Sequence, residues 1–252
     1  MQNNQINIIK ATGEIEEFSS EKVTSSLIRA GASQDLAEKI VTQITPRLYQ
    51  NIPSFEIYSE VMEILKKEQR TIAERYNLKK AIMDLGPTGY PFEKFVSGVL
   101  VKYGHKTELN QIIRGKCVSH EIDIVSQNDK KYMIECKFHS LPGGRTDIKV
   151  ALYTYARFLD VKDTNSFDEP WLITNTRVTQ EVIAYAGCVG MKVTAWDYPE
   201  GESLNELIDK SGLYPITVVI NLTEDQKNSL LEKGFIYCND LTQCEKLAAE
   251  NS

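Results

Sequence analysis

The sequence predicts an α/β fold in which a mixed sheet flanked by helices follows a hairpin with a helical bundle and precedes a small helical segment. Apolar residues recur at helical spacing through most of residues 19–85. Residues 90–196 instead have the pattern of a helix, three strands and then alternating helices and strands, which is typical of an α/β domain. A Gly-Pro-Thr-Gly run at 86–89 separates the two regions. We therefore predict three segments, 1–85, 86–200 and 201–252.

The first segment begins with the pattern of a β-hairpin. Ile6–Lys10 and Ile15–Phe18 are short apolar stretches joined by a turn at Thr12-Gly13-Glu14. Ser19 or Ser20 can cap the next helix, because a serine oxygen accepts a hydrogen bond from a free backbone N–H at a helix start. Four helices are expected in this segment, over residues 21–30, 34–48, 55–67 and 71–85.

The middle segment opens with an apolar helix. Phe92, Phe95, Val96 and Val99 recur at the spacing of one broad helix face, so this helix should pack against a large surface. The further elements expected are strands at 107–113, 121–125 and 132–138, a helix at 147–160, a strand at 171–174, a helix at 179–187 and a strand at 193–196.

The C-terminal segment has the pattern of two helices, at 222–234 and 241–249, joined by a short link. Helix, short link and helix resemble nonspecific DNA-binding hairpins, but the glycine pattern is incomplete and the segment is acidic. We therefore favour packing or dimerisation as its role.

Composition sets broad limits on the class of protein. The chain has 252 residues, 42% of them hydrophobic, which suffices for a sizeable core. No apolar run approaches the roughly 18 residues that span a bilayer, and the N-terminus lacks the pattern of a signal peptide, so we expect a cytoplasmic protein with no membrane contact. The net charge of −6 lies almost entirely in residues 200–252. Charge therefore permits a nucleic-acid partner without indicating one.

Two neighbouring strands carry alternating charged and apolar residues. In Glu121–Val125 the acids alternate with isoleucine, and in Met133–Phe138 Glu135 and Lys137 alternate with apolar residues. Because side chains alternate across a strand, a hairpin of these strands would place Asp123, Glu135 and Lys137 on one face, with Ile122, Ile124, Ile134, Cys136 and Phe138 on the other.

This set of side chains suits phosphodiester hydrolysis. Carboxylates are ligands for Mg²⁺ or Mn²⁺, and the backbone carbonyl of Cys136 could complete the set. A nearby lysine can orient the attacking water and offset negative charge in the transition state. The competing interpretation is that a short acid–acid–lysine pattern is the ordinary solvated face of a sheet.

Residues 86–199 resemble the Mrr-type restriction endonucleases of the PD-(D/E)XK superfamily. The matching stretches are Gly89–His105, His120–Val125, Met133–His139 and Leu172–Met191. The resemblance implies a restriction-endonuclease-like sheet, Asp123 and Glu135 as metal ligands and Lys137 as the catalytic lysine. It also implies that Glu93, on the preceding helix, reaches the same site. Many members carry glutamine where Glu135 stands.

Several neighbouring residues have two open interpretations. Glu121 is either a further metal ligand or a plain strand residue, and His120 either takes part in catalysis or is structural. Gln111, Tyr153 and Arg157 either face DNA or the site, or are ordinary surface residues, with Tyr153 and Arg157 paired along one helix.

The stretch from Ile8 to Val23 resembles the start of the ATP-cone domain, a hairpin followed by a small helical bundle. The resemblance implies that ATP or dATP binds here, with Lys10 and Lys22 nearest the phosphates. Ala11 and Thr12 stand where the family usually has a basic and an acidic residue. The domain is therefore either a nucleotide sensor or a fold kept for interactions alone.

Together these features predict a metal-dependent DNA endonuclease regulated by ATP or dATP. Cutting both strands with one site per chain favours a homo-oligomer, a dimer or larger. The alternatives are a catalytically inactive, nucleotide-responsive DNA-binding or regulatory protein, and a nuclease directed at RNA.

Overall fold

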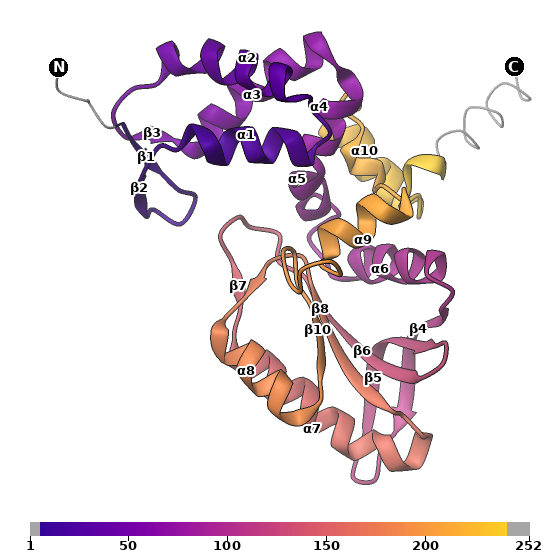
Figure 1. Ribbon diagram of the computed structural model, residues 1–252. Helices are drawn as coiled ribbons and strands as arrows, with labels where there is room; N and C mark the ends of the chain where they lie inside the picture. The colour runs from indigo at the N-terminus through magenta and orange to yellow at the C-terminus, as the bar shows by residue number, and fades with distance from the viewer. Residues whose placement is uncertain (1–5, 241–252) are drawn as a thin grey trace, which may run out of the picture. The chain divides into compact units, whose positions relative to one another are not determined.

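The computed structural model describes residues 6–240 and divides into two compact units. The first unit runs to residue 80 and includes residues 218–221, and the second holds the rest (Figure 1). No helix within the described residues is long and apolar enough to cross a bilayer.

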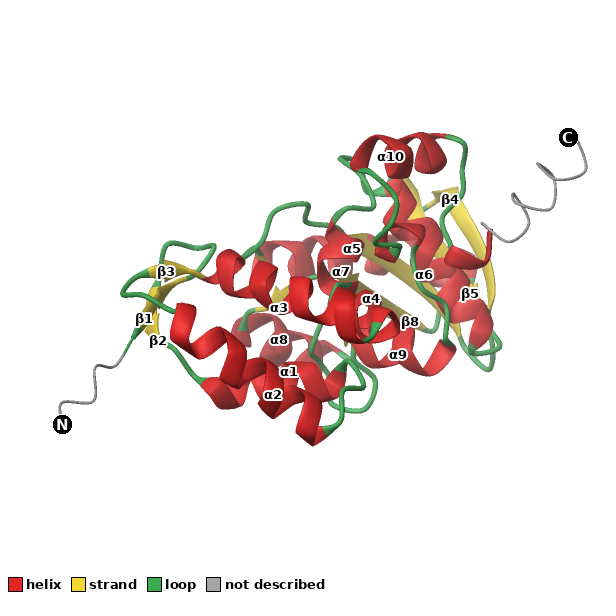
Figure 2. Cartoon of the chain, turned by 90° about the horizontal axis from the view of Figure 1, so that it is seen from above, coloured by secondary structure: helices red, strands yellow, loops and turns green. Residues whose placement is uncertain are grey.

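The first unit contains a three-stranded sheet in the order β2-β1-β3. Strand β1 (Asn7–Ile9) pairs antiparallel with β2 (Ile15–Glu17), as the predicted hairpin requires. Strand β3 (Ile52–Pro53) pairs parallel with β1 and was not predicted. Figure 2 shows these strands beside the N-terminal end of the described chain, with helices forming most of the unit.

The first two helices of this unit begin at serine caps. Ser19 accepts a hydrogen bond from the N–H of Lys22, and Ser33 caps the second helix in the same way. The predicted helix at 71–85 is divided at Asn77, whose side chain accepts a hydrogen bond from the Tyr58 hydroxyl. The helices are α1 (Ser20–Arg29), α2 (Gln34–Ile44), the 3-10 turn η1 (Thr45–Arg47), α3 (Ser54–Glu68), α4 (Arg70–Tyr76) and α5 (Leu78–Met83).

The second unit is built on a five-stranded mixed sheet in the order β10-β8-β6-β5-β4. Strands β4, β5 and β6 pair antiparallel, and β6, β8 and β10 pair parallel, so the predicted mixed sheet is confirmed. A separate pair of two-residue strands, β7 and β9, was not predicted. The strands are β4 (Lys106–Arg114), β5 (Ser119–Gln127), β6 (Lys131–Lys137), β7 (Arg145–Thr146), β8 (Glu169–Thr174), β9 (Arg177–Val178) and β10 (Lys192–Thr194).

Helices cover both faces of this sheet (Figure 1). The buried helix α6 (Tyr90–Lys102) places Phe92 against Phe138, just after β6, with ring centroids 5.5 Å apart. On the other face lie α7 (Ile148–Asn165) and α8 (Gln180–Val189), which bury apolar side chains against β5, β6 and β8.

The C-terminal part of the chain packs on α6 within the same unit. It includes α9 (Leu204–Ser211), the 3-10 turn η2 (Ile216–Val218) and α10 (Glu224–Glu232). The Tyr237 hydroxyl donates to the carbonyl of Lys94 at 2.7 Å, and the Lys94 ammonium donates to the carbonyl of Gly234 at 2.9 Å. The helix predicted at 241–249 lies outside the described residues.

Candidate active site at the end of the β5–β6 hairpin

The two predicted acids lie next to each other where β5 and β6 separate. The pairing of these strands ends with Ile124 opposite Ile134, so Asp123 and Glu135 come directly after the last pair. There the Asp123 Oδ2 atom accepts a hydrogen bond of 2.7 Å from the N–H of Cys136. From this point β5 and β6 no longer pair, whereas β6 stays in register with β8 through Glu135 and Lys137.

The predicted alternation of β5 does not hold through Asp123. Ile122 was expected on the face of Ile124, but it packs in the cluster that contains Val125, Met133 and Phe158 beside α7. Opposite Asp123 on β4, Asn110 has a φ of 50°, and no regular pairing joins the two residues. This local irregularity shifts the side-chain alternation at the point where the acid lies.

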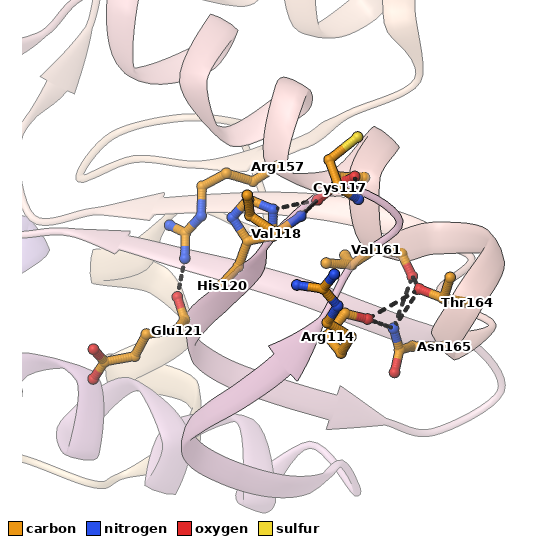
Figure 3. A network of polar contacts seen from close by, with 10 residues as sticks. Arg114, Cys117, Val118, His120, Glu121, Arg157, Val161, Thr164 and Asn165 are labelled. Carbon is orange, nitrogen blue, oxygen red and sulfur yellow. Dashed lines mark hydrogen bonds and ion pairs between the residues drawn. The ribbon is translucent and has the colours of Figure 1, made fainter.

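Arg157 of α7 holds the second acid. Its guanidinium forms a largely buried ion pair with Glu135. It also donates to the carbonyl of Glu121, as Figure 3 shows. The Tyr153 ring lies against the guanidinium, 5.1 Å from its central carbon to the ring centroid. Tyr153 and Arg157 are in contact, as a pair along one helix would be. Arg157 is not a surface residue, however, because it is 8% exposed and contacts the candidate site.

Glu93 reaches towards the same acids from α6. Its Oε2 atom accepts a hydrogen bond of 2.9 Å from the Asn110 side chain. Burial raises the pKa of Glu93, and the carboxylates of Asp123 and Glu121 raise it further, whereas the Asn110 bond lowers it. Helix α6 thus supplies a third acidic side chain, which interacts electrostatically with Asp123 and Glu121 of β5.

Burial also raises the pKa values of the two strand acids. For Glu135 the pKa rises to about 7, because the side chain is desolvated and lies near Asp123, while Arg157 and Lys137 act in the opposite direction. For Asp123 desolvation raises the pKa, and the Cys136 N–H and Arg157 oppose the rise. The carboxylates of Asp123 and Glu135 are therefore close together and largely shielded from solvent.

Lys137 lies at the last position of β6, exposed to solvent and paired in register with Thr174 of β8. Its positive charge lowers the pKa of Glu135, so the ammonium is close enough to act on that carboxylate. No ion pair of this lysine occurs within residues 6–240. The ammonium is thus available to a substrate or a water molecule.

The chemistry of these oxygen donors fits a divalent cation. Asp123 and Glu135 supply carboxylates, and the carbonyl of Cys136 is on the strand between Glu135 and Lys137. Within residues 6–240 no group of three His, Cys, Asp or Glu side chains is arranged to hold a metal ion by itself, so a cation here would also need a backbone oxygen or water as a ligand. Their raised pKa values show why a cation is suitable, because it would offset the repulsion between buried acids.

The remaining neighbours have structural contacts. The His120 Nε2 atom lies 2.8 Å from Asp160 Oδ2 of α7, which supports the structural interpretation of this histidine. Gln111 donates to the carbonyl of Leu109, two residues away on its own strand. A polar cavity of about 320 Å³ is lined by Ser119, His120, Glu121, Asp123, Tyr153 and Arg157.

In the first unit, Lys10 and Lys22 both lie beside Glu16. Their ammonium groups are 2.6 Å and 3.2 Å from the same Glu16 oxygen, and Lys10 makes the largest contribution to lowering the pKa of this carboxyl. The structure thus brings together the two predicted phosphate-binding lysines around one carboxylate. One cavity in this unit, of about 270 Å³, is elsewhere, between α2, η1 and α3.

Comparison with protein families agrees with this architecture. Residues 6–82 match the ATP cone domain, and residues 87–207 match the catalytic domain of Mrr-type restriction endonucleases. The chain therefore contains an ATP cone domain followed by a restriction endonuclease domain of the Mrr type. An uncharacterized protein of Archaeoglobus fulgidus is 45% identical over 152 residues, which are 59% of this chain and 86% of the relative. Both domains, in the predicted order, are therefore confirmed.

A crystal structure of a protein of unknown function is also similar. It has 44% sequence identity and a TM-score of 0.54, and the alignment covers 61% of this chain and 82% of the other. Neither relative comes with a described activity, so the role of each site residue has to be argued from this Mrr-type chain itself.

Sequence reasoning missed Asn110 and the partner of Arg157. Asn110 is inside a strand, where a left-handed residue is not expected, although asparagine tolerates this conformation better than most residues. Arg157 was predicted either to face DNA or the site or to form a surface pair with Tyr153, and its ion pair with Glu135 was not predicted. The signal that could have identified it is an arginine among apolar residues on a helix that must cover the sheet.

Proposed function

We propose that this protein is a Mg²⁺- or Mn²⁺-dependent endonuclease that hydrolyses phosphodiester bonds in DNA. The observation that carries the proposal is the pair of buried acids, Asp123 and Glu135, held with raised pKa values at the end of a hairpin and beside the exposed Lys137. Buried acids are costly to the fold, so their clustering favours a functional role over a solvated sheet face.

In this mechanism each side chain has a separate task. Asp123, Glu135 and the Cys136 carbonyl would hold the metal ion, which polarises the phosphate and makes bound water more acidic. Lys137 orients the attacking water and offsets charge that develops on the phosphate oxygens. Glu93 would assist through its carboxylate beside Asp123, and Arg157 positions Glu135 and opposes the rise of its pKa.

The N-terminal domain, which we assign to residues 1–85, would bind ATP or dATP and regulate cutting by residues 86–200. Support comes from the two lysines around Glu16, because a phosphate could replace that carboxylate between them. Residues 201–252 would stabilise the nuclease domain through packing. We further propose a cytoplasmic protein that acts on both DNA strands as a homo-oligomer.

The test is a cleavage assay on supercoiled plasmid DNA with Mg²⁺, Mn²⁺ or EDTA, repeated with ATP and with dATP. We expect nicked or linear products only with a metal ion, and a rate that changes with nucleotide. An RNA substrate treated in parallel should persist. Absence of DNA cleavage under every metal and nucleotide condition would instead support an inactive regulatory protein.

A further inference from the structure

The turn between β4 and β5 is held in place by hydrogen bonds to α7. Asp160 Oδ1 accepts from the N–H of Cys117 at 2.7 Å, and Oδ2 accepts from the N–H of Val118 at 3.2 Å. The backbone N–H of Lys116 donates to the Asp160 carbonyl at 2.8 Å. Both carboxylate oxygens of Asp160 therefore accept hydrogen bonds from the turn. The pKa of this carboxyl is lowered, first by the hydrogen bond with His120 and then by the N–H groups of Cys117 and Val118.

Further contacts fix the first end of the turn, at Arg114 and Gly115 (Figure 3). The carbonyl of Arg114 accepts from the Thr164 hydroxyl at 3.2 Å and from the Asn165 amide at 3.0 Å. A side chain at Gly115 would come within 2.2 Å of Asp160, so only glycine fits there without displacing that carboxylate. The turn is thus built as a rigid element.

The outer surface of this rigid turn carries charge without a partner. Arg114 and Lys116 are exposed, and neither takes part in an ion pair within residues 6–240. Beside them Val118 is 53% exposed and Ile112 is 79% exposed. A surface of two cations with small apolar neighbours is complementary to a phosphate backbone, which supplies negative charge next to apolar sugar groups.

The turn lies at the same end of the sheet as the proposed active site. Strand β5 begins at Ser119, directly after the turn. Because β6 runs antiparallel to β5, its last residue, Lys137, lies at the same end of the sheet. From Ser119 to Asp123 the strand rises about 13 Å, which corresponds to about four base-pair steps of duplex DNA. The polar cavity extends from Ser119 to Asp123 along this path.

We propose that residues 114–118 form a preorganised DNA-backbone contact in which Arg114 and Lys116 bind phosphates next to the scissile one. This inference rests on the proposed nuclease function and specifies where its substrate binds outside the catalytic residues. Asp160, Thr164 and Asn165 fix the turn in the absence of DNA. The turn therefore loses little conformational entropy when DNA binds.

The test compares DNA binding by the wild type and by Arg114→Gln/Lys116→Gln, measured by fluorescence anisotropy on a short duplex with Ca²⁺ over a range of KCl concentrations. The control is Lys102→Gln/Lys106→Gln, which removes the same charge at the opposite end of the sheet. We expect the turn variant to bind about tenfold more weakly at low salt, with a slope of log K against log salt reduced by about 1.8. The control should keep the wild-type slope and the wild-type rate of cleavage.

A wild-type salt slope in the turn variant, while the wild type still cuts DNA, would overturn this inference alone. An unchanged slope combined with a changed oligomeric state in light scattering would also overturn it, because the turn would then contact a second copy of the chain. A wild type that neither binds nor cuts DNA would remove the proposed function, and this inference with it.

Discussion

The charged clusters around Glu16 and around Glu135 differ in how far their side chains are exposed to solvent. Around Glu16 in the first unit, acid and lysines meet near the surface, with the side chain of Lys22 66% exposed. Around Glu135 in the second unit, the acid meets Arg157 with side chains 17% and 9% exposed. In the first cluster lysine contacts lower an acid's pKa, whereas in the second burial raises it despite the arginine.

This difference indicates what each cluster can do. A solvated ion pair contributes little to stability and can exchange one partner for another at small cost, as binding a phosphate requires. Buried acids instead carry a desolvation penalty that one arginine does not remove, so they favour an added cation. The first cluster suits a reversible ligand, and the second suits a metal-dependent centre.

The largest effect is expected on cleavage. Asp123→Ala or Lys137→Ala should reduce the plasmid cleavage rate by about a thousandfold or more, because each removes a group acting on the reacting phosphate. Circular dichroism should show an intact fold. Glu108→Gln, an exposed acid on β4, serves as the control and should cut at the wild-type rate. Rapid cutting by either alanine variant would show that this trio is not the catalytic centre.

The next effect concerns stability without metal. Arg157→Met leaves Glu135 buried without its cation, so unfolding in urea with EDTA should show a loss of about 3 kcal/mol. The matched exposed pair is Arg177 with Asp197, where Arg177→Met should cost about 1 kcal/mol or less. Equal losses in the two variants would remove the contrast between buried and exposed pairs.

A pH series tests the raised pKa of Glu135. With a folded pKa of about 7 and an ordinary value of 4.5, the proton bound to Glu135 stabilises the fold fully below pH 4.5, and this contribution is lost as pH rises through 7. Glu135→Gln lacks this dependence. In EDTA, the stability of the wild type relative to Glu135→Gln should therefore fall between pH 4.5 and 7 and level off above it. A constant difference over that range would contradict the shift.

The smallest stability effect is expected in the first unit. Lys10→Gln and Lys22→Gln should each change the free energy of unfolding by about 1 kcal/mol or less, because their contacts with Glu16 are solvent-accessible. Affinity for ATP or dATP in calorimetry should nevertheless fall about tenfold. Lys39→Gln, which loses an exposed contact with Glu68, should leave that affinity unchanged. Unchanged nucleotide affinity in both lysine variants would place the ligand elsewhere.

The sequence was sufficient for the features that depend on local pattern. Alternation in Glu121–Val125 and Met133–Phe138 predicted the β5–β6 hairpin, because this signal lies within a few neighbouring residues. The segment boundary at residues 86–89 stays a prediction. The family resemblance added the expected order of domains, which the family models confirm.

The features that the sequence did not predict depend on contacts far apart in the chain. The ion pair of Arg157 with Glu135 joins a helix to a strand 22 residues away, and Asp160 reaches 43 residues back to Cys117. The pairing of β3 with β1 joins Ile52 to Ile8, for which a two-residue strand gives no periodic signal. Such pairings emerge only when the sheets and helices have packed.

Metal titration tests the central contrast most directly. Isothermal calorimetry with Mn²⁺ at pH 7.5 should show binding to the wild type and a loss of at least tenfold in affinity for Asp123→Asn, which keeps the shape of the side chain but removes its charge. The account predicts that Lys10→Gln binds Mn²⁺ as the wild type does. Equal Mn²⁺ affinity in Asp123→Asn and the wild type would contradict the claim that the buried acids of the second unit form a metal-dependent centre.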